Sequence, residues 1–456
     1  MQTIRARWAL VGGRWERDVR LSLAAGRIAD IQIAATASAA AEAMEVALLV
    51  PAPANGHSHA FQRAMAGLTE KRGDAADSFW TWRDLMFRFL DRITPEQVEA
   101  IAAFVQMEML EAGFGASVEF HYLHHQPGGV PYDDPGEMSA RIAAAAETSG
   151  IGLTLLPVAY QYGGCDGRPL GPGQVRFGTA PDAFARLVER AGAILSGLPA
   201  DARLGVAPHS LRAVAREHLP ELAALVPDGP VHMHLAEQRA EVAEVEAAYG
   251  ARPVSWALDH LDLGPRWSLI HCTQMVPDET LRLARSGAVA GLCPLTEASL
   301  GDGVFDGVRW CGAGGRLAVG SDSNIRISLA EELRQLDTTQ RLRDGSRAAL
   351  ATPDRSTGRR LMEDAAAGGA QAAGRGGGAI AIGAWADLLA LDLGHPDLAG
   401  LTPDTCLDAF VFAGDSSMVG EVWSGGRHLV RGGRHVRHEE IRASYQQATR
   451  ALREGL

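Results

Sequence analysis

The chain contains almost no lysine and little cysteine. Lys71 is the only lysine among 43 basic residues, so lysine chemistry is excluded from nearly the whole chain. The cysteines are odd in number and form no C-x-x-C pair, which favours reduced thiols in a cytosolic protein over a disulfide framework. They are Cys165, Cys272, Cys293, Cys311 and Cys406.

Long apolar runs and basic clusters are also missing. No apolar stretch reaches about 18 residues without a charge, so we expect no membrane-spanning helix. Arginines interrupt the first 18 residues, which therefore lack the apolar segment of a signal peptide, and we expect a cytoplasmic protein. The formal charge of -12 argues against a nucleic-acid partner.

What the chain does contain is a repeated alternation of short apolar runs and helical patterns. The apolar runs cover residues 47 to 52, 116 to 122, 152 to 158, 203 to 209, 231 to 237, 267 to 273, 288 to 294 and 316 to 322. Apolar strands that alternate with helices indicate a buried parallel sheet. Eight such units over about 270 residues match a (β/α)8 barrel of the α/β class better than an open sheet.

The two ends of the chain have a different pattern. Residues 3 to 33 alternate around glycine turns, and the C-terminal region contains further strand-like runs, including 408 to 414. We expect both ends to form one small β-sandwich domain, with a helix at the C-terminus. The expected division is 1–48 and 375–456 for this domain and 49–374 for the barrel. Residues 34 to 45 are alanine-rich and predict a loop or a short helix.

Histidines and carboxylates gather at the predicted strand ends, where a (β/α)8 barrel carries its catalytic groups. His57 and His59 are two residues apart, so on a strand both imidazoles face one side and form half of a zinc or iron site. A lone histidine at such a place is more often structural, but chance explains the whole series poorly. The series is His57, His59, His121, Tyr122, His209, His234, Glu237, His271 and Asp322.

This pattern resembles the amidohydrolase superfamily of metal-dependent hydrolases and deaminases. The resemblance covers the whole chain and implies the barrel together with its split β domain. It implies a single divalent metal, because members with two metals use a carboxylated lysine at the fourth strand and Lys71 is not placed there. The implied ligands are His57, His59, His234 and Asp322. These ligands suit zinc, with iron or manganese as alternatives.

The same resemblance implies the chemistry. A divalent metal lowers the pKa of a bound water from 15.7 to about 7 and so supplies a nucleophile at neutral pH. Asp322 can contact the metal and also accept the proton of the water. His271 would orient the nucleophile or stabilise developing negative charge, and Glu237 would carry protons to the substrate nitrogen.

Several longer segments are similar to the formimidoylglutamate deiminases of this superfamily. They are HSHAFQRAMAG, SFWTWRDLMF, EFHYLHHQPGG, PHSLRAV, HMHLAEQ and GSDSNIRISLAEELRQLDTTQRL. The similarity implies a homodimer that hydrolyses N-formimino-L-glutamate to N-formyl-L-glutamate and ammonia in histidine degradation. Arginine suits this dicarboxylate substrate because a guanidinium binds a carboxylate bidentately. The implied substrate-binding residues are Gln62, Arg83, Tyr122, His209 and Arg212.

Two alternative functions stay open. Another deaminase of the superfamily, acting on a nucleobase or a different amidine, would share the metal ligands, because specificity depends on loops. A non-catalytic barrel scaffold is the second alternative, although such proteins typically lose metal ligands and every ligand position is filled here. We assign no role in the site to Glu119, His124, His125, Cys272 and Cys293. The run from 301 to 307 predicts a flexible loop near the site.

Overall fold

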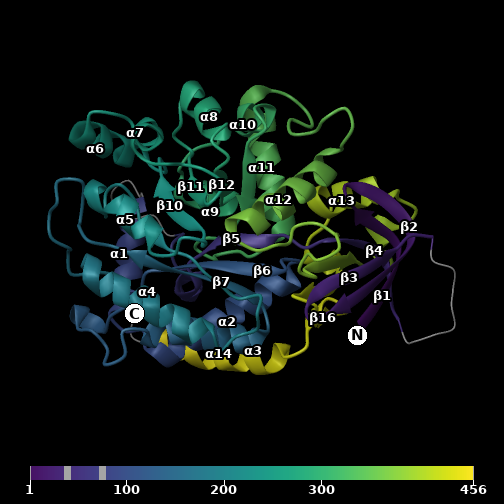
Figure 1. The fold of residues 1–456 in the computed structure, drawn as a ribbon, viewed down its shortest axis with the longest axis horizontal. Coiled ribbons are helices and arrows are strands. Elements are labelled where there is room, and N and C mark those ends of the chain that lie inside the picture. Colours follow the sequence, from purple (N-terminus) through teal and green to yellow (C-terminus); the bar gives the residue numbers. More distant parts are fainter. Residues whose placement is uncertain (1, 35–42, 71–78, 455–456) are drawn as a thin grey trace.

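The structure is a computed structural model that describes residues 2–34, 43–70 and 79–454. Figure 1 shows a group of central strands with helices on several sides, and beside it a twisted sheet in which purple N-terminal strands lie next to yellow C-terminal segments. Most of the alanine-rich segment, for which a loop or short helix was predicted, lies outside the described residues, and so does Lys71.

The small β domain is a mixed sheet built from both chain ends, as predicted. Its strand order is β17-β16-β15-β14-β4-β1-β2-β3. The strands are β1 (Gln2–Val11), β2 (Arg14–Ala24), β3 (Arg27–Gln32), β4 (Met44–Pro51), β14 (Leu388–Leu391), β15 (Val419–Ser424), β16 (Arg427–Arg431) and β17 (Arg434–His435). The antiparallel pair of β4 and β14 joins the two halves. Ile4, Leu21, Leu388 and Trp423 belong to a separate buried core within this sheet.

One predicted barrel strand belongs to this sheet instead. The run from 47 to 52 was expected to open the barrel, but β4 pairs with β1 and β14. The first barrel strand is β5 (Ala54–Ser58), whose sequence ANGHS contains no valine, isoleucine, threonine, phenylalanine, tyrosine or tryptophan. Composition therefore concealed it, because strands are usually recognised by those residues.

The barrel contains the other seven predicted strands. They are β6 (Ala116–His121), β7 (Gly152–Ala159), the interrupted pair β8 (Arg203–Leu204) and β9 (Ala207–Pro208), β10 (Val231–Leu235), β11 (Trp267–His271), β12 (Val289–Leu292) and β13 (Arg316–Val319). They form two parallel sheets, β5 to β9 and β10 to β13. Parallel bridges from Val206 to Val231 and from Ser58 to Asp322 connect the sheets on both sides. The predicted (β/α)8 barrel is confirmed.

Helices cover the outside of the barrel (Figure 1). They are α1 (Phe79–Leu90), α2 (Pro95–Glu111), α3 (Glu137–Ser149), α4 (Pro181–Leu195), α5 (Leu219–Ala224), α6 (Arg239–Tyr249), α7 (Pro253–His260), α8 (Pro277–Ala284), α9 (Pro294–Leu300), α10 (Gly307–Gly312), α11 (Leu329–Asp344), α12 (Thr357–Ala372), α13 (Pro403–Phe412) and α14 (His438–Arg453). The predicted C-terminal helix is α14, which lies against α2 through the stacked rings of Phe104 and Tyr445. Among the described residues, none of these helices has both the length and the apolar character needed to cross a membrane.

The strand predicted over residues 408 to 414 is wrong, because most of this run lies in α13. Thr402 caps the helix by accepting a hydrogen bond from the backbone N–H of Thr405, and Pro403 occupies the first turn. Both are start signals of a helix. Leu407, Phe410 and Val411 are buried at helical spacing, so the apolar run is the inner face of a helix.

Candidate metal centre and active site

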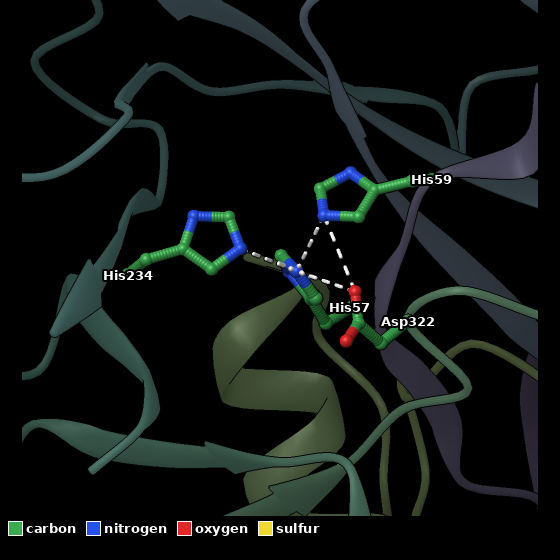
Figure 2. Close-up of side chains that lie close together, drawn as sticks. All are labelled: His57, His59, His234 and Asp322. Atoms are coloured by element: carbon green, nitrogen blue, oxygen red, sulfur yellow. Dashed lines mark hydrogen bonds and ion pairs between the residues drawn. The ribbon is translucent and has the colours of Figure 1, made fainter. Parts of the chain in front are cut away.

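Four side chains converge at the carboxyl end of the barrel strands (Figure 2). His57 belongs to β5 and His59 follows that strand directly, while His234 belongs to β10. Asp322 follows β13, and its backbone N–H donates to the carbonyl of His57. The barrel therefore brings together residues that are as far apart as 57 and 322 in the sequence.

The atoms that could bind a metal are close together. The Nε2 atom of His57 lies 3.2 Å from Nε2 of His59 and 3.1 Å from Nε2 of His234. An oxygen of Asp322 lies 3.2 Å from Nε2 of His59 and 3.5 Å from Nε2 of His57. Three imidazole nitrogens and one carboxylate oxygen thus face one point, as Figure 2 shows.

Hydrogen bonds to backbone carbonyls orient two of these rings. Nδ1 of His59 lies 3.0 Å from the carbonyl oxygen of Phe120, and Nδ1 of His234 lies 3.2 Å from that of His209. A carbonyl only accepts, so Nδ1 carries the hydrogen and the lone pair of Nε2 points inward. Burial lowers the pKa of His59 to about 3 and lowers those of His57 and His234 well below the ordinary value. Neutral rings with converging lone pairs fit a divalent metal.

The backbone around the site has an unusual conformation. Ala236, His271, Cys272 and Asp322 have φ values of 53°, 71°, 53° and 45°. All four lie at or within three residues of the ends of β10, β11 and β13. Non-glycine residues with positive φ are uncommon and carry strain that typically occurs at functional sites. These strained residues thus lie at the carboxyl end of the barrel strands, next to the metal-binding cluster.

A glycine allows β13 to approach the ligand strand closely. A Cβ atom added to Gly320 would lie 2.5 Å from the backbone nitrogen of His57 and 2.6 Å from its oxygen. Such distances are too short for any side chain. Gly320 therefore permits the contact that places Asp322 beside the two histidines of β5.

His271 lies among three buried carboxylates. Its Nε2 atom is 3.8 Å from an oxygen of Glu237 and 3.9 Å from one of Asp322, and its Nδ1 atom is 3.3 Å from Glu297. Burial opposes a charge on this ring, but the carboxylates outweigh it and raise the pKa of His271 well above its usual value. Burial also raises the pKa of Asp322, to about 7. The site therefore contains several groups that can hold or move a proton.

A pocket with an empty volume of about 620 Å³ opens above this cluster. All five predicted substrate-binding residues line it: Gln62, Arg83, Tyr122, His209 and Arg212. The amide of Gln62 donates to the Tyr122 hydroxyl at 2.6 Å. Aromatic and apolar side chains form other parts of the wall, among them Trp82, Phe87, Phe177 and Leu300. The pocket thus combines apolar walls with a few polar groups, as small-molecule sites do.

Arg212 faces this pocket with unused donor capacity. Its Nε atom is buried and has no hydrogen-bond partner among the described residues. Burial opposes its charge, but Glu241 and other neighbouring groups raise the pKa of Arg212 above the ordinary value. A half-buried guanidinium of this kind is suited to an anionic group of a ligand.

Three residues to which the sequence analysis assigned no role in the site make structural hydrogen bonds. Glu119 accepts a hydrogen bond from the backbone N–H of Ala60 at 2.7 Å, and burial raises the pKa of this carboxyl to about 8. His124 and His125 pair with the carbonyls of Val158 and Gly178. These contacts join the strand ends and the loops behind the pocket.

Two residues at the site escaped the sequence analysis. Tyr160 follows the third barrel strand and lines the pocket, and Glu297 follows the seventh strand and contacts His271. The signal was available, because both positions come just after predicted strands whose ends were passed over. Cys293 is buried next to this contact, and its backbone N–H donates to Glu297 at 2.8 Å. The loop from 301 to 307 begins beside the site, where Gln238 donates to the buried carboxylate of Asp302.

Comparison with known proteins gives the family. Residues 48–429 match the amidohydrolase family. The chain belongs to this family. It is 46% identical over 450 residues to the formimidoylglutamate deiminase of Pseudomonas aeruginosa, with 98% of each chain covered.

Two solved structures resemble this one. The crystal structure of an amidohydrolase from Brucella melitensis superposes with a TM-score of 0.95 at 46% identity, and the match covers 99% of this chain and 100% of the other. An adenosine deaminase from Xanthomonas campestris with bound zinc gives a TM-score of 0.82 at 20% identity, with 99% and 98% covered. The second match shows the fold alone.

Proposed function

We propose that this amidohydrolase hydrolyses the terminal C–N bond of N-formimino-L-glutamate and releases N-formyl-L-glutamate and ammonia. The observation that carries the proposal is the 46% identity to a formimidoylglutamate deiminase over 98% of both chains. The pocket supports it, because Arg83 and Arg212 line the same cavity as the metal-binding cluster. A small linear amidine with two carboxylates matches that combination of charges.

The metal proposed for the cluster is zinc, held by His57, His59, His234 and Asp322. Three neutral imidazoles and a carboxylate suit this ion, and the Xanthomonas campestris relative of the same fold has bound zinc. A bound zinc ion would supply a water of lowered pKa, about 7, and so a nucleophile at neutral pH.

Asp322 and Glu237 are proposed to move the protons. Both carboxylates lie within 4 Å of the Nε2 atom of His271, at 3.9 Å and 3.8 Å. Asp322 accepts a proton from the water as its oxygen bonds to the formimino carbon. Burial raises the pKa of Glu237, so this side chain can be protonated and donate to the substrate nitrogen.

The reaction then balances within the pocket. Addition of water to the C=N bond gives a carbon with one hydroxyl group and one amino group. The hydroxyl proton passes to the amino nitrogen through the same carboxylates, the C–N bond breaks, and ammonia leaves as the formyl C=O bond forms. His271 lies between the two acids and stabilises negative charge on the adding oxygen.

The experiment that tests the function is ammonia release from N-formimino-L-glutamate by the purified protein, with metal content measured on the same sample. We expect turnover with about one metal per chain, loss of turnover after treatment with a chelator, and recovery when zinc is added. Guanine and cytosine serve as comparison substrates. Ammonia from either nucleobase, with none from the formimino compound, would overturn the proposal.

A further inference from the structure

Tyr160 lines the pocket at the end of the third barrel strand, and its environment determines that its hydroxyl oxygen is a hydrogen-bond acceptor. The side chain is 6% exposed. Its ring contacts that of His209 edge-on at a centroid distance of 4.5 Å and that of Phe177 at 5.6 Å. The phenol therefore has little freedom to move.

Gln174 makes the phenol oxygen an acceptor. The backbone N–H of Gly171 donates to Oε1 of Gln174 at 2.9 Å, and Nε2 of Gln174 lies 2.9 Å from the hydroxyl of Tyr160. A backbone N–H can only donate, so this contact determines which end of the amide is the oxygen. Nε2 then has to donate to Tyr160, whose own hydrogen is left for another acceptor.

No described residue accepts that hydrogen, and two cationic side chains, Arg83 and Arg212, line the same pocket as the phenol. Burial opposes the charge on both Arg83 and Arg212 and the nearby Tyr160 phenol favours it; overall, the pKa of Arg83 is lowered and that of Arg212 is raised. The backbone N–H groups of Gln161 and Tyr162 donate to the carbonyl of Ala213, at 2.7 Å and 3.0 Å, so the loops that carry Tyr160 and Arg212 are joined.

We infer that Tyr160 donates its hydroxyl hydrogen to a substrate carboxylate that binds between Arg83 and Arg212, and that Gln174 orients this donor. The inference rests on the proposed function for the identity of the substrate. A carboxylate accepts several hydrogen bonds, so one oxygen can contact a guanidinium while another contacts the phenol. Tyr160 thereby adds a neutral donor that selects a carboxylate over a neutral group at this position.

The test measures binding as well as turnover, so that it does not depend on the chemistry. Calorimetry gives the affinity for N-formyl-L-glutamate and for two analogues that each lack one carboxylate, N-formyl-4-aminobutyrate and N-formyl-L-norvaline. In Tyr160→Phe we expect the affinity for the dicarboxylate to fall about 10- to 100-fold, the range of a hydrogen bond to a charged group. The analogue that keeps the carboxylate contacted by Tyr160 should lose affinity to a similar extent. The analogue that lacks this carboxylate should bind the variant and the wild type equally well.

A second variant tests the orientation by Gln174. In Gln174→Glu the carboxylate would accept from both Gly171 and the Tyr160 hydroxyl, which turns the phenol hydrogen away from the ligand. We expect the same pattern as in Tyr160→Phe although the phenol is retained. Tyr162→Phe is the matched control, because Tyr162 lies on the same loop outside the pocket lining, and its affinities should be unchanged.

Unchanged affinities in Tyr160→Phe, or an equal loss for both analogues, would overturn the inference. Ammonia release by the wild-type protein tests the proposed function separately from the role of Tyr160. A wild-type protein that binds N-formyl-L-glutamate but releases no ammonia from the formimino compound refutes the function, while the affinities of the variants still decide the role of Tyr160.

Discussion

The Nδ1 atom of His271 lies 3.3 Å from a carboxylate oxygen of Glu297, and both side chains are buried. The carboxylate also accepts from the backbone N–H of Cys293, which fixes its position. A carboxylate at Nδ1 fixes the orientation of the ring, so that Nε2 faces Asp322 and Glu237. Glu297 is therefore a positioning residue for the group between the two proposed proton carriers.

Glu297→Gln should lower kcat about 10- to 100-fold with a smaller change in KM, because loss of an orienting partner disturbs the reacting groups more than the substrate contacts. Steady-state ammonia release measures both parameters. Glu246→Gln, on the exposed face of α6, is the control and should behave as wild type. A variant of Glu297 with wild-type kcat would show that His271 does not need this partner.

Asp322→Asn should abolish turnover while the fold survives. The amide keeps the shape of the carboxylate but cannot accept the proton of the water, and loss of a general base costs about 10²- to 10⁴-fold in rate. The measurements are kcat and the circular dichroism spectrum of the variant. Near-normal activity would mean that another residue is the base.

Arg83→Met and Arg212→Met should mainly raise KM. Each removes a charged donor for a carboxylate, and we expect an increase of about 10- to 100-fold in KM for each. Arg190→Met provides the control, because Arg190 forms an ion pair with Asp134 on the surface. If either pocket variant kept the wild-type KM, that arginine would not bind the substrate.

The barrel and most of its site could be predicted because their signals are local. Apolar runs in alternation with helices indicate a parallel barrel, and polar residues at the strand ends then point to its mouth. His57, His234 and Asp322 follow from this rule once the strands are placed. Their convergence within 4.8 Å agrees with that prediction.

The remaining features depend on tertiary contacts that a sequence pattern does not contain. The apolar run of β4 is compatible with either sheet, and only its pairing with β1 and β14 places it in the small domain. The roles of Glu297 and Tyr160 depend on which neighbour each one contacts, His271 in one case and Gln174 in the other. Their residue types alone are compatible with many environments.

Asp201 connects the barrel to the small β domain and should make stability depend on pH. Its carboxylate lies 3.1 Å from Arg375 and 2.7 Å from Arg427 of β16, with both the Asp201 and Arg375 side chains almost fully buried. Burial opposes ionisation, but the two arginines outweigh it and lower the pKa of Asp201 below the ordinary value. The ionised form is therefore favoured in the folded state.

A carboxyl with a lowered pKa in the folded state stabilises the protein above the pKa of the unfolded chain, about 3.9, and loses this contribution as the pH falls through the folded pKa. Asp201→Asn should thus lower the free energy of unfolding by about 3 kcal/mol near neutral pH, because it leaves the buried Arg375 and the partly exposed Arg427 short of a partner. The difference in unfolding temperature between wild type and variant should shrink below about pH 4, where the unfolded wild-type chain binds a proton at this carboxyl, and should vanish once the folded carboxyl is protonated too. Thermal unfolding followed from neutral pH to pH 3 measures this difference, and a constant difference across that range would contradict the role assigned to the charge.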